Sequence, residues 1–174
     1  MNEEVTVATS EEMRDLGRQL AALLRAGDLI ILSGPLGAGK TTLTKGIADG
    51  LGVRGPVTSP TFVIARVHPS LVGGAALVHA DAYRLGSARE LDDLDLDADT
   101  DTSVTVVEWG EGLAEGLSGD RLEVAIAPAT QSSGDADEED SSVEGDQPRT
   151  VRIRGVGERW RDARLTREDV INRL

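Results

Sequence analysis

The sequence predicts a single α/β domain in which a mostly parallel β-sheet is sandwiched by helices. Two observations lead to this prediction. Short apolar runs alternate along the chain with segments of helical periodicity, as in folds with a mostly parallel sheet. One of these runs, at 29–32, is continuously apolar (LIIL), which indicates a strand buried on both faces. A length of 174 residues suits one domain better than two.

The first half of the chain gives well-marked helix boundaries. Thr9 and Glu12 have the spacing of a capping box, and apolar residues follow them at helical intervals. Gly52 ends a second helical segment. In chain order, we expect a strand at 5–8, a helix from Thr9 or Ser10 to about 25, a strand at 29–32 and a helix at 40–51.

The second half is expected to supply the remaining strands. A Gly-Gly turn separates two apolar runs, and Thr166 is placed to cap a last helix. We expect strands at 62–67, 76–79, 104–109, 122–127 and 151–153, and helices at 111–117 and 166–174.

The formal net charge of −13 is concentrated in two segments. Residues 90–101 and 128–147 each hold seven acidic residues and no basic ones, so the rest of the chain is nearly neutral. Strong direct binding of nucleic acid is not expected, because it needs clustered Lys and Arg. The polar, acidic composition predicts disorder in the second segment. The predicted organisation is therefore a core at 1–127, an acidic disordered insertion at 128–149, and a strand and helix at 150–174 that complete the same domain.

The sequence contains no cysteine, no secretory signal and no apolar run near the ~20 residues that a membrane helix requires. We therefore expect a soluble, cytoplasmic protein that does not associate with membranes.

Residues 34–41, Gly-Pro-Leu-Gly-Ala-Gly-Lys-Thr, match a phosphate-binding loop. Glycines allow the loop to bend so that its backbone N–H groups surround a phosphate chain. Lys40 is expected to reach the terminal phosphates of ATP, and the Thr41 hydroxyl to bind Mg²⁺. A buried strand precedes the loop and a helix follows it, which predicts the P-loop NTPase fold. The expected nucleotide-binding residues of the loop are Leu36, Gly37, Ala38, Gly39, Lys40, Thr41 and Thr42.

Two apolar runs, 77–81 and 104–108, end in a carboxylate, Asp81 in one and Glu108 in the other. Ligands of α/β sheets bind beyond the carboxyl ends of the strands, so both acids are candidates for holding Mg²⁺ or orienting the attacking water. Both are also compatible with surface acids that end a strand. Trp109 is compatible with a core position or with a lid over the site, and His79 with a buried, hydrogen-bonded histidine.

Four motifs occur in an order and spacing that resemble the TsaE (YjeE) family of bacterial ATPases. These motifs are the phosphate loop, Val57-Thr-Ser-Pro-Thr-Phe62, His79-Ala-Asp-Ala-Tyr-Arg-Leu85 and Val107-Glu-Trp109. The resemblance implies that Thr41 and Glu108 hold Mg²⁺, that Lys40 binds the phosphates, and that Asp81 supports hydrolysis. It also implies a switch-like role for Ser59-Pro60-Thr61. Thr9 would lie near the nucleotide base, a position equally compatible with a helix cap, and Arg149 is a candidate for a C-terminal nucleotide contact.

The same resemblance implies a function in tRNA threonylcarbamoyladenosine modification at position 37. The chain would act with TsaD and TsaB, and its ATP hydrolysis, weak without these partners, would permit multiple turnovers. Two alternatives remain. One is a small-molecule kinase whose lid contains Arg152, Arg154, Arg159, Arg161 and Arg164. The other is a nucleotide-gated binding module with vestigial hydrolysis. A GTPase is disfavoured because the Asn-Lys-x-Asp motif for guanine is absent.

Overall fold

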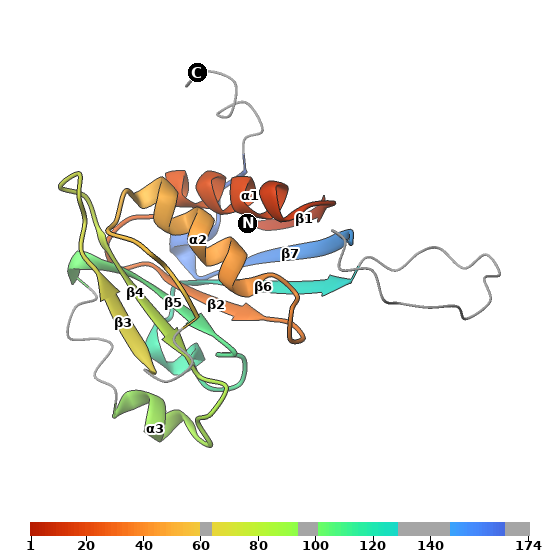
Figure 1. Cartoon of the computed structure of the whole chain (residues 1–174). Helices are drawn as coiled ribbons and strands as arrows, with labels where there is room; N and C mark the ends of the chain where they lie inside the picture. The colour runs from red at the N-terminus through yellow and green to blue at the C-terminus, as the bar shows by residue number, and fades with distance from the viewer. Residues whose placement is uncertain (60–63, 94–100, 129–146, 166–174) are drawn as a thin grey trace.

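One seven-stranded sheet organises the chain, with strand order β1-β7-β6-β2-β5-β4-β3 (Figure 1). The computed structural model describes residues 1–59, 64–93, 101–128 and 147–165. Its elements are β1 (Asn2–Val7), α1 (Ser10–Leu23), β2 (Leu29–Ser33), α2 (Lys40–Leu51), β3 (Ala65–His68), β4 (Ala76–Asp81), α3 (Ala88–Asp92), β5 (Ser103–Glu108), the 3-10 helix η2 (Glu115–Leu117), β6 (Arg121–Pro128), β7 (Arg149–Val156) and the 3-10 helix η3 (Glu158–Trp160).

The four central strands, β6, β2, β5 and β4, run parallel to one another. The antiparallel strands lie at the two edges, where β7 and β1 extend the sheet beyond β6 and where β3 pairs with β4. The predicted P-loop NTPase fold with a mostly parallel sheet is confirmed. The parallel centre brings the carboxyl ends of β2, β4 and β5 to the same edge, and the candidate site lies there.

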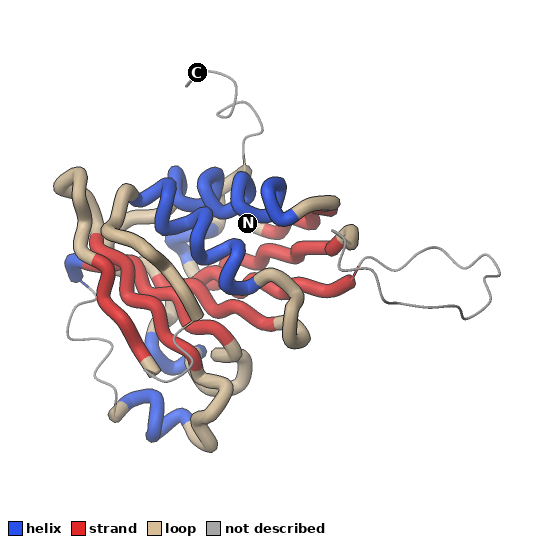
Figure 2. Tube along the Cα trace, in the orientation of Figure 1, coloured by secondary structure: helices blue, strands red, loops and turns tan. Residues whose placement is uncertain are grey.

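Helices cover both faces of this sheet, as Figure 2 shows. The continuous apolar run of β2 explains why. Ile30 and Leu32 pack with the buried residues of α1 and α2, whereas Leu29 and Ile31 pack with Leu91 of α3 and with neighbours on the opposite face. A central strand with helices on both sides has no polar face, so its sequence shows no alternation.

The helices α1 and α2 pack against each other closely because glycines lie at their interface. A Cβ at Gly46 would come within 2.1 Å of the Arg14 carbonyl oxygen, and one at Gly17 within 2.4 Å of the Leu43 carbonyl oxygen. Small residues at such points let two helix backbones approach each other. The position of α2, and of the site residues at its N-terminus, is therefore set partly by α1.

Several elements differ from expectation in length or existence. The strands β1, β4, β6 and β7 are longer than predicted. Helix α3 and η3 were not expected, and only η2 forms within the predicted helix at 111–117. The start of the strand predicted at 62–67 lies partly outside the described residues. The central part of the acidic insertion (129–146) and the last predicted helix also lie outside them.

Within the described ranges, no helix combines the length and apolar character needed to cross a membrane.

Candidate functional site

The loop between β2 and α2 bends at three glycines with positive φ, Gly34, Gly37 and Gly39. Gly34 has a φ of 143°, and a Cβ there would lie 2.4 Å from the Ile126 carbonyl oxygen of β6. Gly39 is the N-cap of α2, with a left-handed φ of 109° and no side chain to cap the helix. The first N–H groups of α2 have no intrahelical acceptors, so together with the helix dipole they favour an anion at this position.

Lys40, the first residue of α2, is buried and folded back over its own loop. Its Nζ donates hydrogen bonds to the carbonyl oxygens of Gly34, at 2.7 Å, and Pro35, at 2.9 Å. The same atom lies 3.7 Å from the centroid of the Trp109 ring. Burial lowers the pKa of Lys40 from its ordinary value, while the charges of Glu108 and Asp81 partly oppose this shift. The ammonium is therefore poorly solvated, and an anionic ligand would favour its charged form.

Thr41 and Glu108 meet although 67 residues separate them in sequence. The Thr41 hydroxyl donates to Glu108, at 3.0 Å from Oε1 and 3.2 Å from Oε2. Glu108 ends β5 and is only 3% exposed, so its carboxylate is held within the protein rather than dispersed in solvent. A second buried side chain, His79 of β4, places its Nε2 2.8 Å from Glu108 Oε1. The buried His79 is confirmed, but only one of its ring nitrogens has a hydrogen-bond partner.

Asp81 ends β4 beside Glu108, since the two residues are register partners in the parallel pair. Its Oδ1 accepts a hydrogen bond from the Tyr83 backbone N–H at 2.9 Å, which holds the carboxylate at the sheet edge. The Tyr83 ring lies 4.9 Å from that of Trp109. Trp109 itself has a positive φ of 60°, an unusual conformation for a residue with a large side chain. It lines the site with its ring over Lys40, rather than lying in the core.

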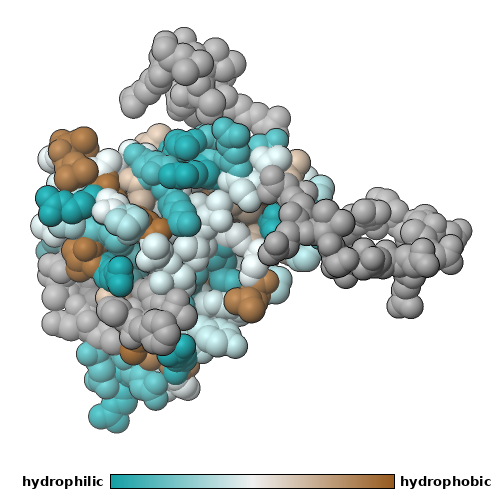
Figure 3. Space-filling view, in the orientation of Figure 1, coloured by the Kyte–Doolittle hydropathy of each residue, from teal (hydrophilic) through white to brown (hydrophobic). Residues whose placement is uncertain are grey.

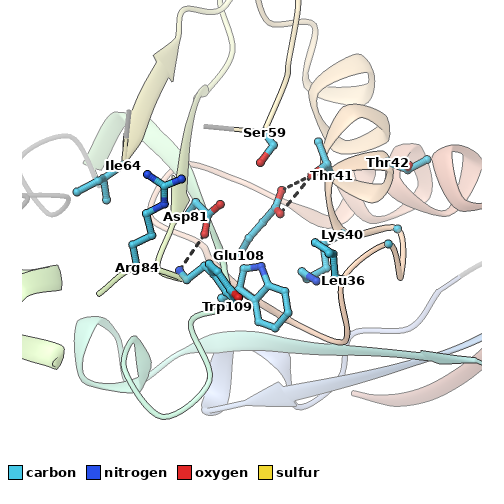
Figure 4. Close-up of a pocket in the computed structure, with 13 residues that line it drawn as sticks. Leu36, Lys40, Thr41, Thr42, Ser59, Ile64, Asp81, Arg84, Glu108 and Trp109 are labelled. Carbon is cyan, nitrogen blue, oxygen red and sulfur yellow. Dashed lines mark hydrogen bonds between the residues drawn. The ribbon is translucent and has the colours of Figure 1, made fainter. Parts of the chain in front are cut away.

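These groups surround a cavity of about 540 Å³, within the usual range for small-molecule sites (Figure 4). Figure 4 shows the Glu108 carboxylate in contact with Thr41, with Asp81 and Arg84 on one side of this pair and Lys40 on the other. Tyr83 and Arg84 carry no signal of their own in the sequence beyond their place in the HADAYR motif. The lining residues are Leu36, Gly37, Gly39, Lys40, Thr41, Thr42, Ser59, Ile64, Asp81, Tyr83, Arg84, Glu108 and Trp109.

Two of the expected nucleotide-binding residues do not line this cavity. Thr9 is the N-cap of α1, where its hydroxyl accepts a hydrogen bond from the Glu12 N–H at 3.1 Å. Ala38 belongs to the loop, but its side chain is buried in the hydrophobic core. Arg149 does reach the loop, because its guanidinium donates to the Gly37 carbonyl oxygen at 3.3 Å.

Apolar side chains are exposed at a few separate places on the surface. Figure 3 shows brown residues at the upper left, over the turn between β3 and β4, with hydrophilic residues between them and the other apolar spots. Among the residues that the structure describes, the large apolar ones with high exposure are Leu36 in the loop, Val67, Leu71, Val72 and Tyr83. Leu36 and Tyr83 belong to the candidate site, since both line the cavity.

Comparisons with known proteins agree with the motifs and with this geometry. The family model for threonylcarbamoyl adenosine biosynthesis protein TsaE matches residues 7–136. The chain is 60% identical over 152 residues to the tRNA threonylcarbamoyladenosine biosynthesis protein TsaE of Streptomyces coelicolor, a match that covers 87% of this chain and 95% of that protein. Identity to the Bacillus subtilis protein of the same name is 36% over 150 residues, covering 86% of this chain and 84% of that protein.

A solved structure shares the fold. A crystal structure of Bacillus subtilis YdiB matches with a TM-score of 0.67 and 31% sequence identity, and the match covers 92% of this chain and 89% of that one. The resemblance that the four motifs indicated is thus confirmed over most of the chain: the protein belongs to the TsaE family of threonylcarbamoyl adenosine biosynthesis proteins.

Proposed function

We propose that the chain is a magnesium-dependent ATPase of tRNA threonylcarbamoyladenosine biosynthesis that acts with proteins similar to TsaD and TsaB. The observation that carries this proposal is the contact between the Thr41 hydroxyl and the Glu108 carboxylate beside the phosphate loop. Its pathway is the one named for the TsaE family and for the related proteins. The hydrolysis would permit the partner enzymes to complete many turnovers.

The donor set at this contact fits Mg²⁺. A hydroxyl and a carboxylate supply hard oxygen ligands, and nucleotide-bound Mg²⁺ usually takes only one or two protein ligands beside phosphate oxygens. The described residues contain no cluster of three or more His, Cys, Asp or Glu side chains that could hold a metal without a nucleotide. Thr41 and Glu108 would therefore hold a cation that arrives with ATP. When bound, it would neutralise charge on the phosphoryl oxygens.

The other side chains support phosphoryl transfer to water. Burial disfavours the charged form of Lys40 when no anion lies beside it. A phosphate of ATP would restore a favourable partner for this ammonium, so little solvation would be lost when the two groups meet. Among the contacts of the described residues, Asp81 makes no hydrogen bond to Thr41; it lies half-buried at the cavity wall, which suits a group that orients the attacking water. We therefore propose separate roles for the two acids, Glu108 for the cation and Asp81 for water, and the Thr41–Glu108 contact supports this division.

The alternative of a small-molecule kinase loses its main support. That alternative required a lid of five C-terminal arginines, and none of these five residues lines the cavity. Arg159 forms an ion pair with Asp28 at 3.0 Å, and Arg152 forms one with Glu4 at 2.7 Å. Arg84, which does line the cavity, is a single residue on the β4 side and does not make a lid.

The ATPase proposal is tested by measuring phosphate release with ATP and Mg²⁺. We expect Lys40→Ala and Glu108→Gln to lower turnover by about 100-fold or more, as loss of a preorganised charge at a reacting centre does. EDTA should abolish the activity. Glu4→Gln, which neutralises an exposed acid on β1, is the matched control and should retain full turnover. Wild-type activity in Glu108→Gln, or activity that is indifferent to EDTA, would contradict the proposed metal site.

The pathway role is tested with purified TsaD and TsaB. Formation of threonylcarbamoyl-tRNA is followed over many turnovers with and without the chain. We expect product to stop near one equivalent per enzyme without it and to continue with the chain and ATP. If the chain hydrolyses ATP but leaves product formation unchanged, the pathway role is wrong and a screen for phosphoryl acceptors becomes the next experiment.

A further inference from the structure

His79 is a fully buried histidine in direct contact with the site, and the proposed function gives it no role. It lies on β4, two residues before Asp81, and β4 pairs in parallel with β5, which ends at Glu108. Its side chain is 0% exposed, and that of Glu108 is 4% exposed. A polar contact between two such buried groups is costly to lose, because neither can turn to water instead.

The hydrogen-bond chemistry of this contact assigns the donor. An ionised carboxylate only accepts hydrogen bonds, so the bond of 2.8 Å requires a hydrogen on His79 Nε2. The other ring nitrogen, Nδ1, is buried and has no partner. With the hydrogen on Nε2, Nδ1 is an acceptor that receives no hydrogen bond. The other tautomer would instead bury an N–H group at Nδ1 that has no acceptor.

Glu108 Oε1 is thereby held from two sides. It accepts from His79 Nε2 and from the Thr41 hydroxyl at 3.0 Å, whereas Oε2 has the longer Thr41 contact of 3.2 Å. A glutamate side chain has three rotatable bonds, and without His79 the Thr41 hydroxyl is the one hydrogen-bond donor, within the part of the chain that the structure describes, that would fix its carboxylate. Thr41 is itself a proposed ligand of the cation, so it is not an independent support.

We propose that His79 is a positioning residue, which fixes the Glu108 carboxylate against Thr41 so that the pair is preorganised for a divalent cation. This inference rests on the proposed function, because it concerns the same cation. It adds that the cation affinity depends on a side chain that touches neither metal nor nucleotide. Hydrogen-bond partners of metal-ligating residues typically contribute 10–100-fold to metal affinity.

The chain offers a matched control in His68. It too is buried, at 6% exposure, with one ring nitrogen bonded and the other without a partner. Its Nδ1 lies 2.9 Å from the Arg54 carbonyl oxygen, so it contacts backbone and not a site carboxylate. Replacement of either histidine should disturb packing similarly, but only replacement of His79 should alter the metal site.

Three replacements of His79 separate the hydrogen bond from the volume of the ring. In His79→Gln, the amide nitrogen lies about as far along the side chain as Nε2 and keeps a donor for Glu108. In His79→Asn, the amide is one methylene shorter and does not reach. His79→Leu removes the donor and keeps an apolar side chain. Because Gln and Asn are alike in polarity, their comparison remains decisive even if the Leu variant does not fold.

The readout is Mn²⁺ binding in the presence of ADP, followed by electron paramagnetic resonance of free Mn²⁺. ADP affinity without metal is measured in parallel. We expect the Mn²⁺ dissociation constant to rise about 10–100-fold in His79→Asn and His79→Leu, to stay within a few-fold of wild type in His79→Gln, and to be unchanged in His68→Leu. ADP affinity without metal should be the same in all variants.

The outcomes distinguish this inference from the proposed function. If wild-type protein with ADP binds no Mn²⁺, the metal-dependent function is wrong and the positioning role is wrong with it. If wild type binds Mn²⁺ and His79→Asn binds it equally well, only the positioning role is overturned. An equal loss in the Gln and Asn variants would also overturn it, since the donor would then not be the feature that matters.

Discussion

At the residue scale, Lys40 has a lowered pKa, and this predicts a particular pH dependence of stability. The folded chain binds the Lys40 proton less tightly than the unfolded chain does. Stability therefore rises with pH between the lowered value and the ordinary lysine pKa of about 10.4. We expect the free energy of unfolding in urea to include this rise in the wild type and to lose it in Lys40→Met.

The sequence supplies a control, because Lys45 is the only other lysine. Lys45→Met should keep the alkaline rise that Lys40→Met loses. If the free energy of unfolding changes with pH equally in Lys40→Met and in the wild type between pH 8 and pH 10, folding does not lower the pKa of Lys40 and the prediction is wrong.

The same scale shows how far single residues can be predicted. The contact of Thr41 with Glu108 follows from a loop motif and a strand end, because parallel strands bring their carboxyl ends together. The contact of His79 with Glu108 does not follow, since it depends on the register between β4 and β5 and on a rotamer. On the sequence alone, Trp109 was compatible with a core position or with a lid over the site. Its positive φ and its contact with Lys40, which only the structure shows, place its ring against the site.

At the element scale, the packing of α1 on α2 predicts that Gly46→Ala is destabilising. Alanine is favoured over glycine inside a helix by about 1 kcal/mol. A Cβ at Gly46 would nevertheless meet the Arg14 carbonyl oxygen at 2.1 Å, so the helices must separate. We expect a net loss of about 1–3 kcal/mol, which is typical of overpacking, seen as a lower urea midpoint.

Gly116 in η2 is the matched control, because a Cβ there would meet nothing within 4 Å. Gly116→Ala should change stability by less than about 0.5 kcal/mol, as surface substitutions usually do. If Gly46→Ala is as stable as wild type, the two helices are not held at this spacing by their glycines.

Elements were predictable where local periodicity determines them. The apolar run of β2 and the Gly52 stop of α2 are local signals, and both elements form as expected. Helix α3 was missed because it has five residues and its buried Leu91 packs against strands distant in sequence. Its start did carry a signal, since Ser87 accepts a hydrogen bond from the Glu90 N–H as a capping residue does. The strand order, with β2 at the centre, depends on long-range pairing that no local pattern contains.

At the scale of the whole molecule, the two ends of the acidic insertion lie next to each other and next to the phosphate loop. Pro128 of β6 and Arg149 of β7 are register partners, and Arg149 contacts the Gly37 carbonyl oxygen. A two-residue Asn-Gly turn is the usual way to join antiparallel strands at such a pair. The fold therefore does not require residues 129–148 as a connection.

We predict that a chain with Asn-Gly in place of 129–148 folds and hydrolyses ATP. Shortening the loop should stabilise the fold by up to about 2 kcal/mol through a smaller closure entropy. The replacement also removes seven acidic residues and no basic ones, so the formal charge changes from −13 to −6. A less negative net charge should speed ATP association at low salt and weaken the salt dependence of that rate. Urea unfolding and stopped-flow binding of a fluorescent ATP analogue measure the two effects.

A third chain separates length from charge. It keeps the full insertion but replaces its Asp and Glu residues by Asn and Gln. This variant should bind ATP as fast as the shortened chain while retaining the wild-type stability, because charge governs association and loop length governs closure entropy. If the shortened chain is folded but has lost ATP hydrolysis, and the neutral full-length variant has not, the insertion contributes to the site through its backbone or its length. The boundary of the functional core would then include 128–149.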